Sequence, residues 1–352
     1  MSGPPEHDPL NPHDSAPPAE DSGLIEGAGP IDQGFSPGTE PCESTRALEA
    51  AEELDPEGGF SPNSPEYFSY LGASESPQPE IPPPARIPNL GDLCILIVLA
   101  FLGLVGSWLL TMLALHFHLF GVSTVQRANT DIHYTLGAQA ALYLLAFGLC
   151  LVVFPLFWHK SFFAGLQWNG ATALRLRGRL FAAAALCFVL AMVDEFLLPG
   201  PENAPIDKLF QTPMSAWLLF GFGVTFAPFF EEIVFRGFLL PTLCTAWDWT
   251  IERSTGRPVR PLDANGHPQW SIFAMIVASI LTSIPFALMH AEQTAHALGP
   301  FLLLVCVSLV LCWARLAARS LAASVLVHAS YNFILFSLMI IGTGGFQHMD
   351  KM

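Results

Sequence analysis

Long apolar runs alternate with short polar loops from Asp92 to the end of the chain. Seven of these runs are long enough to cross the roughly 30 Å hydrocarbon core of a bilayer as an α-helix. They cover about 93–118, 134–158, 179–199, 214–241, 271–291, 298–315 and 319–343. The pattern therefore predicts an all-α, polytopic membrane domain over residues 91–352.

Residues 1–90 have the opposite character. They contain 17 of the 30 acidic residues and 18 of the 30 prolines but only two Lys or Arg, so they carry the whole net charge of −15. Such a segment cannot bury enough apolar surface to offset the entropy of ordering. We expect a disordered, acidic, Pro-rich cytoplasmic tail that serves as a solvated tether, in which Ser44–Leu54 could form a short helix. A secretory signal is not expected, because no basic start is followed by an apolar run.

The loops between the predicted helices differ in charge on the two sides of the membrane. One side has nine basic residues, Lys160, Arg175, Arg177, Arg179, Arg253, Arg257, Arg260, Arg315 and Arg319, and the other has Arg127, Lys208 and Lys351. Loops rich in Lys and Arg face the cytoplasm. The N-terminus is therefore predicted inside and the C-terminus outside. We expect a bacterial plasma membrane, or the endoplasmic reticulum if the source is eukaryotic.

The fourth apolar run contains three charged residues, Glu231, Glu232 and Arg236. A charge within hydrocarbon costs roughly 3 kcal/mol or more, so such residues face a polar interior and are candidates for function. Glu232 and Arg236 are four residues apart and can pair on one helix face. Glu231 is turned about 100° away and has no partner on its own helix. A spare carboxylate of this kind suits a general base. The alternative is an ion pair that only locks two helices together.

Two later apolar runs each supply a histidine. The first has the pattern Phe286-x-x-x-His290, and the second has His328-x-x-x-Asn332, which places an imidazole and an amide on one helix face. Both side chains of the second pair can donate hydrogen bonds to a developing oxyanion. Taken alone, the histidine of the first pattern is more often a packing residue than a ligand, and the second pattern could equally be polar contacts between membrane helices.

Taken together, the three elements contain a spare carboxylate, two imidazoles and an amide. This set can activate a water molecule and stabilise a tetrahedral oxyanion, as peptide hydrolysis requires. An HExxH zinc motif and a GxSxG nucleophile elbow are both missing from the sequence. The residues therefore favour a membrane-embedded peptidase of another kind.

The motifs EExxxR, FxxxH and HxxxN, in this order on transmembrane helices, resemble the CAAX protease and bacteriocin-processing family (CPBP, or Abi) of intramembrane metalloproteases. The resemblance covers about residues 214–344. It implies that Glu231 is the general base, assisted by His290, and that His328 and Asn332 stabilise the oxyanion.

In the same resemblance, Glu232, Arg236 and Phe286 shape the site. The family is usually regarded as metal-dependent, with zinc as the metal. Glu231, His290 and His328 could be the three ligands, although activation of water without a metal is equally consistent with these residues.

The resemblance implies an endopeptidase of the CAAX-protease type. Its partners would be a hydrophobic, lipid-anchored or membrane-inserted peptide or protein substrate and the surrounding membrane lipid, and no nucleic acid is expected. Two other functions remain open: a non-proteolytic membrane scaffold or immunity-type regulator, and a proton-coupled carrier that uses Glu231 and His290 as a relay.

The predicted depths of the site residues do not all agree. Glu231 and His328 lie about ten and nine residues from the cytoplasmic ends of their runs, whereas His290 lies about nineteen residues into its run, a mismatch of roughly 15 Å. We therefore expect the fifth helix to protrude into the cytoplasm by about two turns around Trp270–Met275. The preceding loop, Trp247–Pro268, could cap a cytoplasm-facing cavity.

Overall fold

The computed structural model describes residues 85–200, 205, 210 and 212–347. The predicted helix over Ser44–Leu54 and nearly all of the predicted tail lie outside these residues. Within this described part of the chain, seven helices are long and apolar enough to cross a membrane, which agrees with the seven predicted spans and indicates an integral, multi-pass protein. They are α3 (Leu90–His116), α5 (Ile132–Trp158), α8 (Arg177–Leu197), a continuous fourth helix (Pro213–Thr255), α12 (Ile272–Met289), α13 (Leu298–Ala318) and α14 (Leu321–Gly342). The described residues contain no β-strand.

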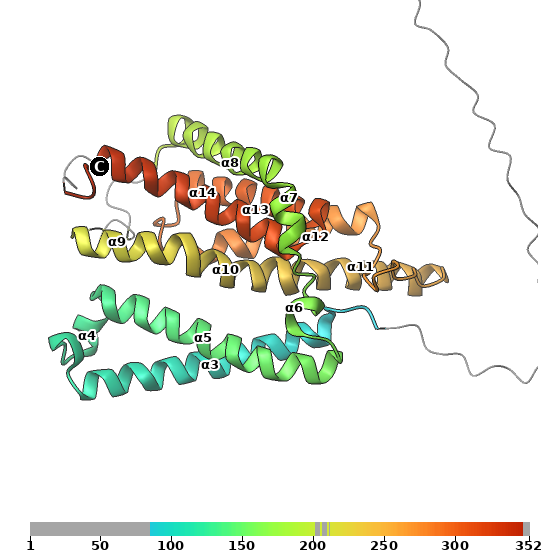
Figure 1. Ribbon diagram of the computed structural model, residues 1–352, viewed down its shortest axis with the longest axis horizontal. Helices are drawn as coiled ribbons and strands as arrows, with labels where there is room; N and C mark the ends of the chain where they lie inside the picture. Colours follow the sequence, from blue (N-terminus) through green and yellow to red (C-terminus); the bar gives the residue numbers. More distant parts are fainter. Residues whose placement is uncertain (1–84, 201–204, 206–209, 211, 348–352) are drawn as a thin grey trace, which may run out of the picture. The chain divides into compact units, whose positions relative to one another are not determined.

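Helices α3 and α5 form an antiparallel hairpin (Figure 1). Helix α3 begins with a capping box, in which the Asn89 side chain accepts the backbone N–H groups of Gly91 and Asp92 while Asp92 accepts that of Asn89. The indole Nε1 of Trp158, the last residue of α5, donates to Oδ1 of Asp92 at 2.9 Å. One carboxylate therefore caps α3 and joins it to the end of α5.

The fourth helix is longer than predicted. Its start at Pro213 agrees with the expected residue 214, but it continues for 43 residues to Thr255 instead of ending near residue 241. The first part of the predicted loop Trp247–Pro268 is therefore helical. Hydropathy alone places the end of this helix too early. The turns beyond residue 241 contain polar side chains, which are buried because they have polar partners in the folded protein. Oε1 of Glu252 accepts a hydrogen bond from Nη2 of Arg86 at 2.9 Å. The N-terminal end of the described chain is therefore bound to the fourth helix.

The position at which α12 begins explains how His290 and Glu231 reach the same depth. Its N-cap residue Ser271 donates its backbone N–H and its hydroxyl to Asp248 at 2.7 and 2.6 Å. The start of α12 thus lies beside residue 248, about two turns past the predicted end of the fourth span. From there Glu231 is about 26 Å back along the fourth helix, and His290 is about 28 Å along α12. The two side chains consequently reach the same level.

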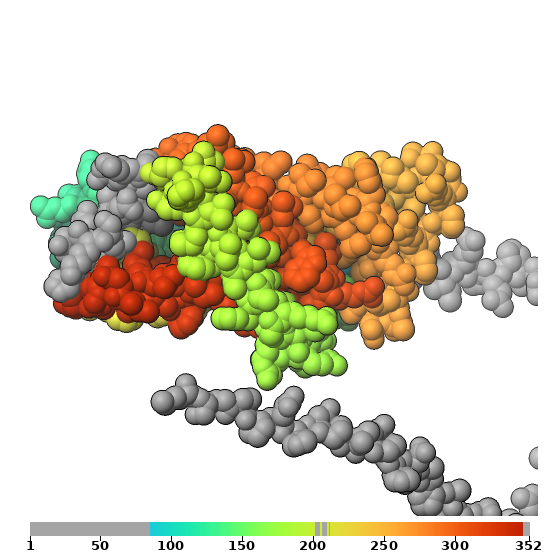
Figure 2. Space-filling model, turned by 90° about the horizontal axis from the view of Figure 1, so that it is seen from above, coloured from blue at the N-terminus to red at the C-terminus, as the bar shows by residue number. Residues whose placement is uncertain are grey.

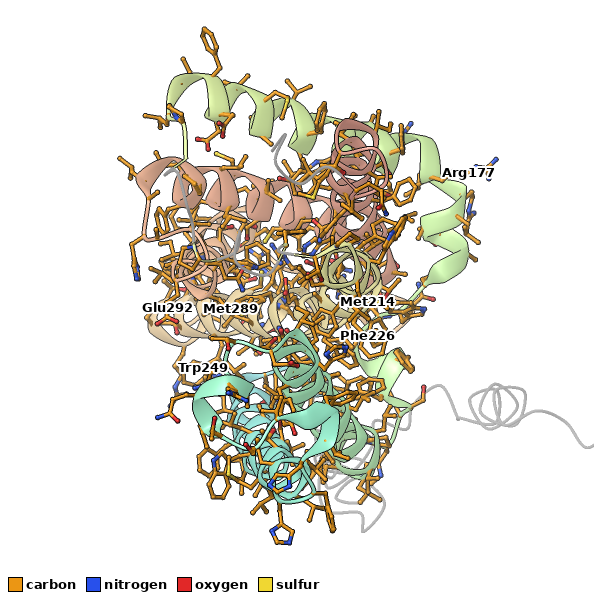
Figure 3. All side chains as sticks on the ribbon, turned by 90° about the vertical axis from the view of Figure 1, so that its left-hand side faces the viewer. Arg177, Met214, Phe226, Trp249, Met289 and Glu292 are labelled. Atoms are coloured by element: carbon orange, nitrogen blue, oxygen red, sulfur yellow. The ribbon has the colours of Figure 1, made fainter. Side chains whose placement is uncertain are left out.

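The remaining helices pack around the fourth helix. The short helices α6 (Phe162–Gly165) and α7 (Gly170–Arg175) connect α5 to α8, and α8 lies across α13 and α14 (Figure 2). The side chain of Arg177, at the start of α8, points away from the other helices (Figure 3). Small buried residues such as Ala184 and Ala323 let α8 and α14 approach closely, as is usual between membrane helices.

Candidate active site

The fourth helix is irregular on both sides of the two glutamates. Its segments are α9 (Pro213–Gly221), a π-helical segment (Phe222–Phe226), α10 (Ala227–Glu232), a second π-helical segment (Ile233–Leu239) and α11 (Leu240–Thr255). Pro228 and Pro241 follow the two π-helical segments. A proline cannot donate to the carbonyl four residues before it and its ring collides with that group, so a widened turn is a natural response. π-Helical turns are rare and are often found at functional sites.

Glu232 and Arg236 form the ion pair that their spacing predicts. Nη1 of Arg236 lies 2.9 Å from Oε1 of Glu232, and both side chains are fully buried. The guanidinium also donates through Nη2 to the hydroxyl and carbonyl oxygens of Ser308 in α13, at 2.7 and 3.1 Å. Its carbon Cζ lies 4.5 Å from the centre of the Phe286 ring. The pair therefore connects the fourth helix to both α12 and α13.

His328 lies between the two glutamates. Its Nδ1 is 3.0 Å from Oε1 of Glu232, and its Nε2 is 4.0 Å from Oε2 of Glu231. Because a carboxylate only accepts, Nδ1 carries a proton. The imidazole is consequently oriented by Glu232 and presents its other nitrogen to Glu231.

His290 faces the same oxygen from the end of α12. Its Nδ1 lies 2.8 Å from the carbonyl oxygen of Phe286, which can only accept, so this nitrogen is the donor. Its Nε2 lies 3.9 Å from Oε2 of Glu231 and is an acceptor in the neutral imidazole. The fourth, fifth and seventh membrane helices thus bring the side chains of residues 231, 290 and 328 together, as the motifs predict.

Phe286 and Asn332 have different surroundings. The Phe286 ring is buried among Arg236, His290 and His328, with its centre 5.0 and 5.9 Å from the two imidazoles. Asn332 instead donates through Nδ2 to the carbonyl oxygen of Gly223, at 2.7 Å. This bond ties α14 to the first π-helical segment, and no described hydrogen bond joins Asn332 to the glutamates or histidines. Its predicted role at an oxyanion remains a prediction.

Several residues around the site are not evident from the motifs. Ser308 holds Arg236, and Arg315 donates through Nε to the carbonyl oxygen of Arg236 at 3.2 Å. Both lie on α13, and Arg315, which the sequence pattern places in a loop, is buried in this helix. Tyr143 is a clearer case, because Gln139 and Tyr143 are polar residues one turn apart in an apolar run, and they hydrogen-bond at 2.9 Å.

An apolar cavity of about 170 Å³ leads to Glu231. It lies between the α3–α5 hairpin and the fourth helix, and Tyr143, Phe147 and Phe230 contribute aromatic walls. Met289, at the end of α12, lines it where the hairpin meets the other helices (Figure 3). The first two membrane helices, which carry no motif, therefore complete the surroundings of the carboxylate.

The three predicted zinc ligands do not fit a zinc ion as they stand. Ligand atoms about 2.0–2.1 Å from a tetrahedral zinc are about 3.3 Å from one another, whereas Oε2 of Glu231 is 3.9 and 4.0 Å from the two imidazole nitrogens. Within the part of the chain that the structure describes, no group of three His, Cys, Asp or Glu side chains is placed to hold a metal ion. The donor types match zinc, but their spacing does not.

The fold and this site define a polytopic α-helical membrane protein with a buried Glu–His–Arg cluster. Residues 213–334 match the model of the family described as Type II CAAX prenyl endopeptidase Rce1-like, so this region is a domain of that family. The resemblance predicted from the three motifs is thereby confirmed, and at the level of the family it supports an intramembrane endopeptidase. No curated protein and no solved structure matches the chain.

Proposed function

We propose that this protein is an intramembrane endopeptidase of the CAAX-protease type, in which Glu231 activates water to hydrolyse a peptide bond. The observation that supports this function is the convergence of Oε2 of Glu231 with Nε2 of His290 and Nε2 of His328, at 3.9 and 4.0 Å. A water molecule that donates two hydrogen bonds of about 2.8 Å at nearly a right angle joins acceptors about 4 Å apart. The carboxylate and the His290 imidazole have this spacing.

In the proposed reaction, Glu231 removes a proton from the water as the oxygen attacks the scissile carbonyl carbon. The carbonyl oxygen becomes an oxyanion. A protonated His328, held by Glu232, would donate to this oxyanion through Nε2, and Asn332 would contribute the second N–H of its amide. When the C–N bond breaks, Glu231 returns its proton to the leaving amine. Peptide and water are thus converted to a carboxylic acid and an amine, and transfer of the acid proton to the amine gives the carboxylate and the ammonium ion, with no other reactant.

The substrate is proposed to be a hydrophobic, lipid-anchored or membrane-inserted peptide or protein. The apolar cavity beside Glu231 supports this class, because it would accept an aliphatic or aromatic group and exclude a charged one. The proposed orientation has the N-terminus in the cytoplasm and the C-terminus outside. The plasma membrane of a bacterium and the endoplasmic reticulum of a eukaryote are the two proposed locations.

The metal-dependent form of this proposal would need Glu231, His290 and His328 to move closer together, because their spacing suits a shared water better than zinc. We therefore assign no step to a metal. A chelator arm in the experiment below tests this choice.

The decisive experiment is cleavage of fluorogenic peptides, prenylated and unprenylated, by the full chain in liposomes with and without a chelator. Loss of a general base reduces the rate about 10²–10⁴-fold, and we expect this loss for Glu231→Gln at unchanged thermal stability. Retention of activity by Glu231→Gln, or no cleavage of any peptide by the natural chain, would contradict the proposal. Flux of protons into the same liposomes would favour the carrier.

A further inference from the structure

Arg315 is a buried arginine that has no acidic partner among the described residues. It lies on α13 with 2 % of its surface exposed. Its guanidinium donates to three neutral oxygens, the carbonyls of Arg236 and Leu166 and the Oε1 of Gln167, at 3.2, 3.4 and 2.8 Å. Arg236, by contrast, is paired with Glu232. A buried charge that is not balanced by an opposite charge is costly, so Arg315 needs a further explanation.

Arg315 lines a cavity of about 150 Å³ that is distinct from the one beside Glu231. The polar part of its lining consists of two arginines, a histidine and two glutamine side chains, and no carboxylate lines it: Arg315, Arg319, His267, Gln167 and Gln269. All of these side chains can donate hydrogen bonds. The exposed residues Gln269 and Arg319 form its rim, so the cavity opens to the outside of the protein.

The acid that contacts two of the lining side chains is already paired. Asp263 lies 3.2 Å from Nη1 of Arg319 and 3.6 Å from Nδ1 of His267. The backbone N–H of His267 donates to its carboxylate and holds the pKa of Asp263 below its usual range, so this group stays ionised at neutral pH. Asp263 thus pairs with one of the cavity's two arginines and with its histidine, and not with Arg315. The cavity keeps an excess of positive charge even with Asp263 ionised.

We propose that this cavity binds a phosphate-type oxyanion, which would supply the counter-charge that Arg315 otherwise lacks. Arginine guanidinium groups bind phosphate oxygens through strong, charge-assisted hydrogen bonds. The cavity lies where α12 begins and α13 ends. The phosphate could therefore belong to a phospholipid headgroup at the membrane surface or be free in solution. The proposal does not depend on the peptidase function.

Arg315 also contacts the Glu–His–Arg cluster, so an anion bound to Arg315 would affect the stability of the fourth helix. Nε of Arg315 donates to the backbone carbonyl of Arg236, whose side chain holds Glu232. A bound anion would fix the guanidinium that supports this turn of the fourth helix. Binding should consequently raise the stability of the folded protein by mass action.

The test uses the full chain in a phosphate-free detergent, with the thermal unfolding temperature measured against inorganic phosphate at constant ionic strength. Gln269→Glu places a carboxylate at the rim, where it repels or replaces the anion without altering a described hydrogen bond. Gln126→Glu is the matched control, because Gln126 is exposed and lies outside the cavity. We expect a saturable rise for the natural chain and the control, and an apparent Kd about tenfold or more higher for Gln269→Glu.

Two further measurements distinguish the sources of phosphate. If the ligand is a lipid headgroup, mass spectrometry of the purified natural chain should show a bound phospholipid that Gln269→Glu loses, and phosphate added to phospholipid nanodiscs should have no effect. If the ligand is free phosphate, the rise in unfolding temperature should persist in nanodiscs. Equal behaviour of the three proteins, or neither a phosphate response nor a bound phospholipid in the natural chain, would overturn the proposal.

Discussion

His328 lies between the two adjacent glutamates, with Nδ1 3.0 Å from Oε1 of Glu232 and Nε2 4.0 Å from Oε2 of Glu231. The two carboxylates therefore have different surroundings although they are neighbours in sequence. Glu232 is held by Arg236 and His328, whereas Oε2 of Glu231 lies 3.9 and 4.0 Å from the imidazole nitrogens of His290 and His328, beyond hydrogen-bond distance. This difference supports the proposal that Glu232 is structural and that Glu231 is the reactive acid.

Replacing Glu232 should lower the stability of the folded protein and not only its catalytic rate. Glu232→Gln leaves the fully buried Arg236 without its counter-charge, and breaking a buried ion pair in this way costs about 3–5 kcal/mol. Unfolding of the purified protein in detergent would measure the loss. Glu292→Gln is the matched control, because Glu292 is exposed and has no described ion pair. A change of equal size in both variants would contradict the structural role of Glu232.

His290 should matter for activity more than for stability. Its imidazole is partly exposed, and its Nδ1 contacts only a backbone carbonyl of its own helix. We expect His290→Gln to lower kcat about 10²-fold or more, as for loss of a group that assists proton transfer, and to change the unfolding free energy by less than about 1 kcal/mol. His296→Gln, in the exposed segment that follows, should have neither effect. A stability loss that accounts for the fall in kcat would refute the assignment.

Chelation should leave peptide cleavage intact. The separations of 3.9 and 4.0 Å around Oε2 of Glu231 suit a shared water and exceed those of zinc ligands. We therefore expect the initial rate in the presence of EDTA to equal the untreated rate. A metal assay of the purified protein should be run beside it. Loss of the rate on chelation, with recovery on adding Zn²⁺, would show that the three side chains close around a metal.

Asp248 should influence catalysis although it lies far from Glu231, because it fixes the position of α12. It accepts the backbone N–H and the hydroxyl of Ser271, and this contact sets the level at which His290 meets Glu231. Asp248→Ala should cost about 1–3 kcal/mol of stability, as expected for a buried hydrogen-bonded acid, and should also lower kcat. A double-mutant cycle with Ser271→Ala isolates the side-chain contact, with an expected coupling of about 0.5–3 kcal/mol. Additive effects would exclude the coupling.

Much of the architecture follows from the sequence alone, because a segment that crosses hydrocarbon must be long, apolar and internally hydrogen-bonded. That local requirement predicts seven helices from hydropathy. It also makes the charges at 231, 232 and 236 conspicuous, and the four-residue spacing within one helix predicts the Glu232–Arg236 pair. The order of three short motifs on these helices was enough to indicate the family.

Contacts between helices were decided only by the tertiary structure, because they depend on how far each helix extends and how it is rotated. The contact between Asp248 and Ser271 fixes α12 at the position where His290 is level with the glutamates. The fourth helix continues to Thr255 because its polar side chains bind to polar groups on other segments. The two π-helical segments change the rotation of the fourth helix around the glutamates. The positions of Ser308 and Arg315 beside Arg236 follow from this three-dimensional packing, which no local pattern in the chain encodes.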